Sequence, residues 1–220
     1  MISVIVPAYN EEKTLPGTLR ALFQQPGVFE VIVVDGGSSD GTRAIAGARA
    51  AVRLLTAPKG RASQMNAGAR AARGEWLLFL HADTLLPENA LSRLNQWEAD
   101  PYYQAGGFTQ RFSGDDWRLR LVSLLDNFRC RRTGIIFGDQ ALFVRRVLFQ
   151  NLGGFPVQPI LEDVAFCQKL VQAVNPVMLV CDHRLAQVRA ERYLAQPLPL
   201  LGDLDPHRAG SPDRALVPLL

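Results

Sequence analysis

The chain has 220 residues, of which 48% are hydrophobic and 20% charged, enough for one large domain or two small ones with a sizeable core. Its 24 Lys and Arg against 21 Asp and Glu give a formal net charge of +3. That balance suits a protein that binds phosphorylated small molecules and excludes the strongly basic signature of a nucleic-acid-binding protein.

Cysteine usage and the N-terminus give expectations about location. The three cysteines lie far apart without paired spacing, which predicts neither a disulfide framework nor a zinc site. The sequence begins directly on an apolar run, with no basic stretch or cleavage site typical of a signal peptide. No apolar run approaches the roughly 20 residues of a membrane span. We therefore expect a cytoplasmic protein without a transmembrane segment, for which contact with a membrane surface stays open.

Strand and helix patterns alternate over roughly the first hundred residues. Four short runs rich in branched residues are typical of parallel strands buried on both faces, at residues 2–6, 30–35, 52–57 and 75–80. Helical patterns follow the first three of them, at residues 15–23, 40–51 and 61–72. The alternation predicts a mostly parallel, doubly wound central sheet flanked by helices, in the α/β class.

The second half of the chain has a different character. Residues 104–112 alternate poorly and hold two glycines, which indicates an edge strand or a bent strand. A further strand is expected at 138–146 and a further helix at 161–174. Five apolar side chains at helical spacing form a stripe, namely Trp117, Leu121, Leu124, Leu125 and Phe128. From Pro197 the chain is rich in proline without periodicity, so we expect no regular element there, and disorder is compatible with this composition.

Polar residues follow the predicted strands at the edge where α/β sheets bind their ligands. Asp35 ends the second strand, and Asp83 follows the fourth in the sequence His81-Ala82-Asp83-Thr84. Lys59 and Arg61, after the third strand, supply positive charge suited to a phosphate. Together these strand ends predict a binding crevice for a polar, phosphorylated ligand.

Each of these residues also has a purely structural explanation. Asp35 and Asp40 flank a Gly-Gly-Ser-Ser turn and can cap a helix or form Asx turns, an explanation favoured for Asp40. Asp83 is equally well explained as a helix cap before residues 87–94. The carboxylates of Glu162 and Asp163 suit the start of a helix because of its dipole. A lone His81 is more often a structural residue, and the cluster of Arg129, Arg131 and Arg132 is more often a solvated face.

The order of the motifs favours binding and catalytic roles for these residues over the separate structural explanations. Six segments resemble family-2 glycosyltransferases of GT-A fold in sequence and spacing, namely SVIVPAYNEE, VIVVDGGSSDGT, PKGRASQMNAGARAARGEWLLFLHADT, GDQALFVRR, LGGFP and LEDVAF. The resemblance covers residues 2 to about 181 and is closest to a bacterial subgroup that carries HADT and GDQ. It implies a glycosyltransferase domain at 1–182, with a nucleotide-sugar-binding half at 1–100 and a smaller, mixed acceptor-side half at 101–182.

The resemblance also implies roles for individual residues. Substrate-binding positions implied by the matching motifs are Pro7, Ala8, Tyr9, Glu11, Asp35, Lys59, Arg61, Asn66, Asp139 and Gln140. Among these, Asp35 is expected to bind a uracil-type base, and Arg61 and Asn66, with Lys59, to line the diphosphate. The family's Asp-x-Asp metal motif here reads His81-Ala82-Asp83, so Asp83 carries over as ligand of Mn²⁺ or Mg²⁺, with His81 as a candidate second donor. Asp163, beside Glu162, matches the general base.

The implied activity is hexosyl transfer with inversion, from a nucleotide-diphosphate sugar of UDP type to an acceptor hydroxyl. Two alternatives are a binding protein of the same fold without turnover, and a nucleotidyltransferase. The latter needs a Gly-rich basic loop after the first strand, which residues 7–12 lack. Residues 183–220 form an atypical Pro-rich tail that departs from the family pattern, through a shifted reading frame, divergence or truncation.

Overall fold

The computed structural model describes residues 1–158, 160–174, 177–179 and 186–188. Within these ranges seven strands form one sheet in the order β3-β2-β1-β4-β8-β6-β9. From one edge to the other they are β3 Val52–Thr56, β2 Phe29–Asp35, β1 Ile2–Ala8, β4 Trp76–Phe79, β8 Phe143–Arg145, β6 Ala105–Phe108 and β9 Val177–Leu179. The first four are mutually parallel, and β8 runs antiparallel to both of its neighbours. The predicted, mostly parallel sheet is confirmed.

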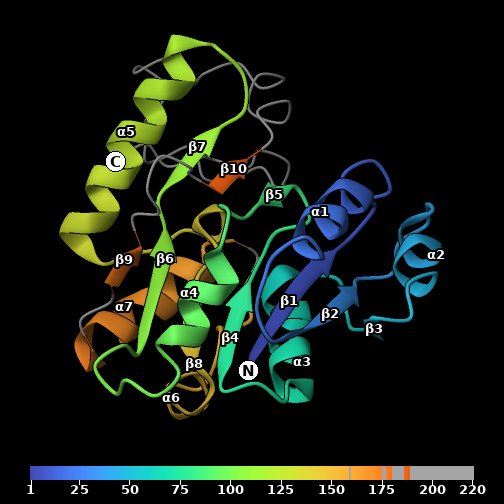
Figure 1. Cartoon of the computed structure of the whole chain (residues 1–220), viewed down its shortest axis with the longest axis horizontal. Coiled ribbons are helices and arrows are strands. Elements are labelled where there is room, and N and C mark those ends of the chain that lie inside the picture. The colour runs from blue at the N-terminus through green and yellow to red at the C-terminus, as the bar shows by residue number, and fades with distance from the viewer. Residues whose placement is uncertain (159, 175–176, 180–185, 189–220) are drawn as a thin grey trace, which may run out of the picture. The chain divides into compact units, whose positions relative to one another are not determined.

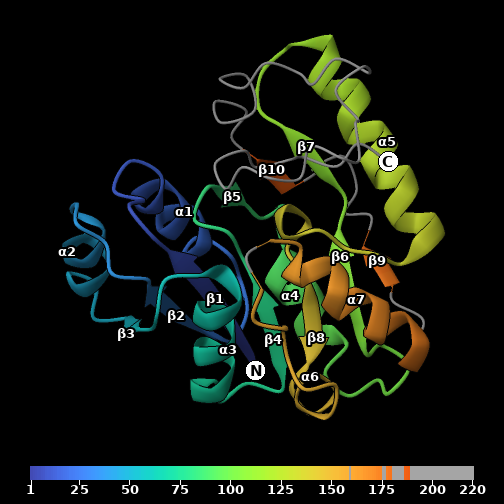
Figure 2. The same cartoon turned by 180° about the vertical axis from the view of Figure 1, so that it is seen from behind.

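Helices cover both faces of this sheet (Figures 1 and 2). The helices of the described chain are α1 Leu15–Leu22, α2 Thr42–Gly47, α3 Arg61–Ala71, α4 Ala90–Gln96, α5 Trp117–Thr133, α6 Arg146–Asn151 and α7 Glu162–Ala173. Figure 1 shows α1 and α4 in front of the sheet, and Figure 2 shows α3, α6 and α7 on the other side. A doubly wound sheet needs both layers because its strands are apolar on both faces.

The alternation of side chains along each strand builds two separate cores. On β1, Val4 and Val6 join the cluster under α1 and α4, whereas Ile5 joins the cluster under α3 and α7. The same alternation on β4 sends Leu78 to the first cluster and Phe79 to the second. Successive strand residues point to opposite faces, so one buried run supplies both cores.

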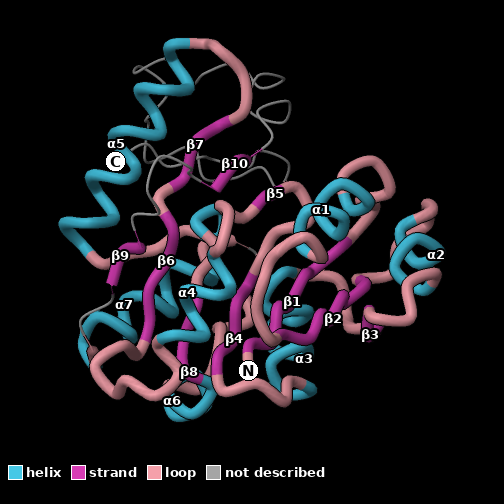
Figure 3. The backbone as a smooth tube through the Cα atoms, in the orientation of Figure 1, coloured by secondary structure: helices cyan, strands magenta, loops and turns pink. Residues whose placement is uncertain are grey.

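A smaller three-stranded sheet contains β5 Thr84–Leu85, β10 Ala186–Val188 and β7 Gln110–Phe112, with β10 in the middle. The strand β7 continues from β6 after a break at Thr109, so one stretch serves both sheets (Figure 3). The expected bend at 104–112 is therefore present, although β6 is an inner strand and only β7 lies at an edge. The strand β10 falls within the predicted tail, whereas the Pro-rich part from Pro197 lies outside the described residues.

One expectation for the second half needs correction. The strand expected at 138–146 is confined to β8, because Gly138–Gln140 forms a 3₁₀ turn and Ala141 has a positive φ of 48°. The helix indicated by the apolar stripe is present as α5, and the stripe lies on its exposed side: Trp117 is 69% exposed and Leu124 65%. The helix instead packs its opposite side, with Leu119, on the protein.

Candidate functional site

The carboxyl ends of β1 and β2 are held together by one buried side chain. In the sheet register Ala8 lies opposite Asp35, and the Gly36 N–H donates to the Ala8 carbonyl at 2.9 Å. From α3, the Gln64 Nε2 donates to the carbonyls of Ala8 and Val34, each at 2.8 Å. Gln64 was not predicted. Its signal in the sequence is an amide on the apolar side of an Ala-rich helix, where a buried polar group needs partners.

The carboxylate of Asp35 is fully buried at this edge. Its Oδ2 accepts from the Gly37 N–H at 3.0 Å, and its Oδ1 accepts from the Ser38 N–H at 3.1 Å. The Asx-turn explanation therefore describes Asp35 correctly, and the carboxylate has lone pairs beyond these two bonds. Binding of a base by Asp35 stays a prediction. For Asp40 the Asx-turn interpretation is confirmed, since its Oδ1 accepts from the Thr42 N–H at 3.0 Å just before α2, whose cap residue is Gly41.

Two cations lie where the predicted crevice requires positive charge. The Lys59 Nζ lies 4.0 Å from the centre of the Tyr9 ring, which joins the loops after β1 and β3. The Arg61 Nε, at the start of α3, lies 2.8 Å from Glu162 Oε1, at the start of α7. Burial raises the pKa of Glu162, and the Arg61 guanidinium opposes that rise. Arg61 is about half exposed, so it can still face a phosphate while Glu162 fixes its position.

Other predicted binding residues are used within the fold. The Asn66 Nδ2 donates to the Phe155 carbonyl at 2.8 Å, and its Oδ1 accepts from the Phe155 N–H at 3.0 Å. Gln140 is fully buried, and its Oε1 accepts from the Phe137 N–H at 3.0 Å. Both amides have structural partners, so contact of Asn66 or Gln140 with a substrate is an untested prediction that their surroundings do not favour. The Glu11 N–H donates to Thr42 Oγ1 at 2.7 Å, which ties its loop to α2.

The turn at His81–Thr84 leaves the sheet at the end of β4. The Thr84 N–H donates to the His81 carbonyl at 3.1 Å, and Thr18 Oγ1 on α1 donates to the Ala82 carbonyl at 2.6 Å. The alternative that Asp83 caps a helix is wrong, because α4 begins only at Ala90 and its cap residue is Asn89. These two hydrogen bonds hold the turn, and Asp83 therefore lies at the edge of the sheet.

Three predicted motifs meet at Gly138. A methyl group built on Gly138 would lie 2.5 Å from the His81 Cε1 and Nε2 atoms and 3.5 Å from Asp163 Oδ2, so the imidazole ring packs on the glycine backbone. The Gly138 N–H donates to Asp163 Oδ2 at 2.7 Å, while the Val164 N–H donates to Asp163 Oδ1 at 2.8 Å. The turn after β4, the Gly-Asp-Gln turn and the start of α7 are therefore in direct contact.

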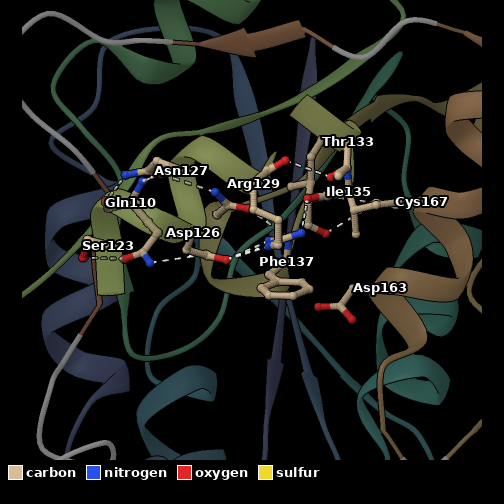
Figure 4. Close-up of polar contacts among 12 residues, drawn as sticks. Gln110, Ser123, Asp126, Asn127, Arg129, Thr133, Ile135, Phe137, Asp163 and Cys167 are labelled. Atoms are coloured by element: carbon tan, nitrogen blue, oxygen red, sulfur yellow. Dashed lines mark hydrogen bonds and ion pairs between the residues drawn. The ribbon is translucent and has the colours of Figure 1, made fainter. Parts of the chain in front are cut away.

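The inner side of α5 supports this meeting point (Figure 4). The Arg129 Nη2 lies 2.8 Å from Asp126 Oδ1, its Nη1 donates to the Ile135 carbonyl at 3.0 Å, and its guanidinium lies 3.6 Å from the centre of the Phe137 ring. The solvated-face interpretation is therefore wrong for Arg129, although Arg131 and Arg132 are exposed. Its spacing of three residues from Asp126 on a predicted helix was the available signal.

The carboxyl of Asp139 has an unusual electrostatic environment. Burial, together with the nearby carboxylates of Asp126, Asp163 and Asp83, raises its pKa to about 7. Its Oδ1 is buried and has no hydrogen-bond partner among the described residues. Four acidic groups therefore interact at one place, and one of them gains a proton near neutral pH.

Replacing Asp139 with asparagine should stabilise the protein above pH 7 and have less effect near pH 4. Between the ordinary value of 3.8 and the folded value of about 7, the folded state holds a proton that the unfolded chain has released. Stability therefore falls as pH rises through this window. Because Asp139 is partly exposed, we expect a gain of about 1–3 kcal/mol at pH 8, below the roughly 4 kcal/mol of a full three-unit shift.

Urea unfolding of the parent and Asp139→Asn at several pH values measures this gain. The matched control is Asp115→Asn, whose side chain is 95% exposed and should show no such pH dependence. If the free energy of unfolding of Asp139→Asn depends on pH as strongly as that of the parent, the prediction is contradicted.

The residues near Asp83 have a limited capacity to bind a metal. Within the described residues, no group of three or more His, Cys, Asp and Glu side chains is arranged to hold a metal ion. The donors at the β4 exit are the hard carboxylate oxygens of Asp83 and the imidazole of His81. This set fits a divalent cation that takes most of its ligands from phosphate oxygens and water, as Mg²⁺ commonly does.

A comparison with known families decides the relationship. The family model for glycosyl transferase family 2 matches residues 3–151. The chain belongs to glycosyl transferase family 2. The matched region contains the β1, β2 and β4 exits together with the Gly138 turn.

Family-2 relatives with assigned names are similar over part of their length. An undecaprenyl-phosphate 4-deoxy-4-formamido-L-arabinose transferase from Sodalis glossinidius is 28% identical over 155 residues, which are 66% of this chain and 48% of the relative. An uncharacterized glycosyltransferase of Haemophilus influenzae is 30% identical over 191 residues, covering 78% of this chain and 62% of the relative. The chain spans about half the length of the first of these relatives.

Solved structures show the same GT-A fold. S. aureus TarS 1–349 in complex with UDP-GlcNAc superposes with a TM-score of 0.69 at 24% identity, covering 86% of this chain and 58% of TarS. The mannosyltransferase PcManGT from Pyrobaculum calidifontis, in complex with GDP-Man and Mn²⁺, gives a TM-score of 0.65 at 25% identity, covering 86% of this chain and 56% of that protein. No helix among the described residues of this family-2 chain is long and apolar enough to cross a membrane.

Proposed function

We propose that this protein is a metal-dependent, inverting glycosyltransferase that moves a sugar from a nucleoside-diphosphate sugar to an acceptor hydroxyl. The observation that carries the proposal is the contact of the His81–Asp83 turn with Gly138 and, through its N–H, with Asp163. This contact brings the family's metal-motif position and its base position to one place. Nucleotide sugars and Mn²⁺ in the complexes of TarS and PcManGT support the same donor class and cofactor.

In the proposed reaction the residues after β1 to β3 hold the donor. Asp35 accepts a hydrogen bond from the base, and Tyr9 lies beside Lys59 at the opening. Lys59 and Arg61 stabilise the negative charge of the diphosphate, because the attraction between a guanidinium or ammonium group and a phosphate is stronger in a site that excludes water. A nucleotide of UDP type is the expected donor.

Asp83, with His81 as second donor, would hold a Mn²⁺ or Mg²⁺ ion. When bound, such an ion neutralises charge that develops on the leaving diphosphate. Asp163 takes the proton from the attacking hydroxyl as general base. Attack from the side opposite the leaving group, in a single displacement, inverts the anomeric configuration.

Titration calorimetry with UDP, GDP and ADP tests the donor site, with and without Mn²⁺. We expect one nucleoside diphosphate to bind preferentially and to need the cation. In the same measurement, Asp35→Ala should weaken binding of the preferred nucleotide by about 1–3 kcal/mol and reduce discrimination among bases, because a buried hydrogen bond is lost. The matched control Asp40→Ala removes an Asx-turn carboxylate from the same loop and should leave discrimination among bases unchanged.

Three other outcomes are informative. If no nucleotide binds, the proposed function is wrong. If Asp35→Ala keeps the parental preference, Asp35 is a turn residue only. If the preferred nucleotide binds but its sugar derivative releases no diphosphate with any acceptor alcohol or with water, the alternative of a binding protein without turnover is favoured.

A further inference from the structure

The outward side of α5 is an apolar surface of five side chains. Their exposed fractions are 69% for Trp117, 46% for Leu121, 65% for Leu124, 56% for Leu125 and 62% for Phe128. At about 100° of rotation per residue, the five fall within one sector about 100° wide. We call this sector the outer face of α5. It lies on the side opposite the buried residues of the same helix, Leu119, Ser123 and Cys130.

The inward side of α5 is already packed, so the outer face is not needed for the fold. Asn127 fixes the helix to β7, since its Nδ2 donates to the Gln110 carbonyl at 2.8 Å and its Oδ1 accepts from the Gln110 N–H at 2.9 Å. Ser123 adds a bond from the Phe112 N–H at 3.3 Å. Exposed apolar side chains in a contiguous group mark an interaction surface.

Positive charge borders the outer face. Three exposed arginines flank the apolar sector, namely Arg118, Arg120 and Arg131, and the exposed Arg132 lies one turn beyond Phe128, with its guanidinium 5.9 Å from the centre of that ring. The first two pair with aspartates that precede the helix, Asp116 and Asp115. In the described part of the chain no carboxylate forms an ion pair with Arg131 or Arg132. The single acidic residue of α5, Asp126, is turned inward to Arg129.

We propose that the outer face of α5 binds the surface of an anionic lipid bilayer. Trp, Leu and Phe side chains on one side of a helix, bordered by arginines, suit a helix that lies in the plane of the bilayer interface. The apolar side chains enter the acyl boundary, and the arginines contact lipid phosphates. The inference rests on α5 alone and does not depend on the proposed reaction.

Charge complementarity favours an anionic bilayer over a second copy of the chain as the partner of the outer face of α5. In a symmetric dimer formed through the outer face, the same patch meets itself. Arg131 and Arg132 of each copy would then border the equivalent face, where the exposed aspartates Asp115 and Asp116 already pair with Arg120 and Arg118 and leave no net negative charge to offset them. A bilayer rich in anionic lipid provides the opposite charge along the whole helix.

Co-sedimentation of the full chain tests the proposal. We expect binding to vesicles of phosphatidylcholine with phosphatidylglycerol, weaker binding to phosphatidylcholine alone, and a decrease with salt because the arginine contribution is screened. The double variant Leu124→Glu/Leu125→Glu should bind at least about tenfold more weakly, and Arg131→Ser/Arg132→Ser should lose most of the preference for anionic vesicles. The matched control is Tyr102→Glu/Val147→Glu, at two other exposed apolar positions, which should bind as the parent does.

Trp117 reports insertion, since Trp76 is fully buried and the partly buried Trp97 is stacked on Tyr103 at 4.0 Å, and the variant without Trp117 supplies the background of these two. Its emission should shift to shorter wavelength on vesicles and be quenched by brominated acyl chains, and Trp117→Phe should remove the quenching. Absence of vesicle binding by the parent, or equal losses in the control, would overturn the proposal. It is also overturned if Leu124→Glu/Leu125→Glu converts a dimer to a monomer without changing vesicle binding, or if Trp117 is already shielded from solvent before vesicles are added.

Discussion

Replacing Asp163 with asparagine is expected to lower the rate of sugar transfer by about 10²–10⁴-fold while the affinity for the nucleoside diphosphate is unchanged. The base acts on the proton of the acceptor and not on the nucleotide, so the two quantities separate. The Asp163 oxygens accept from the Gly138 and Val164 N–H groups, and an asparagine oxygen can serve only one of them. We therefore expect a stability loss of about 0.5–1.5 kcal/mol in addition.

Release of diphosphate from the preferred nucleotide sugar, and calorimetry of the diphosphate, measure both effects on one variant. The matched control is Asp126→Asn, which removes one negative charge from the same cluster of carboxylates but leaves the predicted base unchanged. Near-parental turnover in Asp163→Asn would return Asp163 to the role of a helix-start residue that closes the Gly138 turn.

Replacing Asp83 with asparagine is expected to abolish the gain in nucleotide affinity that Mn²⁺ or Mg²⁺ provides. Loss of residues that merely orient a metal ligand commonly costs 10–100-fold in affinity, so loss of a direct carboxylate ligand should cost about a hundredfold or more. The fold should survive, because the bond from the Thr84 N–H to the His81 carbonyl and the bond from Thr18 to the Ala82 carbonyl also hold the turn. His81→Ala should have a smaller effect on the metal dependence.

Nucleotide titrations at several cation concentrations measure this loss. Asp40→Asn is the matched control, since Asp40 lies at the same sheet edge and its Asx-turn bond from the Thr42 N–H can also be accepted by an asparagine oxygen. If the metal dependence of Asp83→Asn equals that of the parent, Asp83 is not the ligand and the metal part of the proposal fails.

The sequence was sufficient for the part of the site that follows from strand order. Branched apolar runs predict β1, β2 and β4, and parallel pairing then places Asp35 opposite Ala8 without any knowledge of side-chain contacts. The turn after β4 is fixed in the same way, because β4 pairs directly with β1. Local periodicity and parallel pairing together determine which strand ends meet.

The contacts that close the site depend on packing between distant segments and were not predictable from periodicity. Thr18 has no pattern that distinguishes a buried bridge from a surface position, and the position of the Gln64 amide on the apolar side of its helix does not reveal which carbonyls it meets. The outward orientation of the α5 stripe had no sequence signal, because the helix also carries Leu119 and Cys130 on its other side. Arg129 was misjudged because it was grouped with Arg131 and Arg132, which are exposed, and not with Asp126.

The paired hydrogen bonds between Asn66 and Phe155 have a consequence for folding. They join α3 to a turn 89 residues further along the chain, so neither bond can form until the strands between them have been ordered. Contacts of long sequence separation carry a loop-closure cost and tend to form late. Until Phe155 is in place, the amide of Asn66 lacks this backbone partner, and α3 is held by its apolar contacts, by Gln64 and by the bond from Arg53 to the Ala71 carbonyl. The crevice beside α3 is therefore expected to be the last part of this fold to form and the first to be lost.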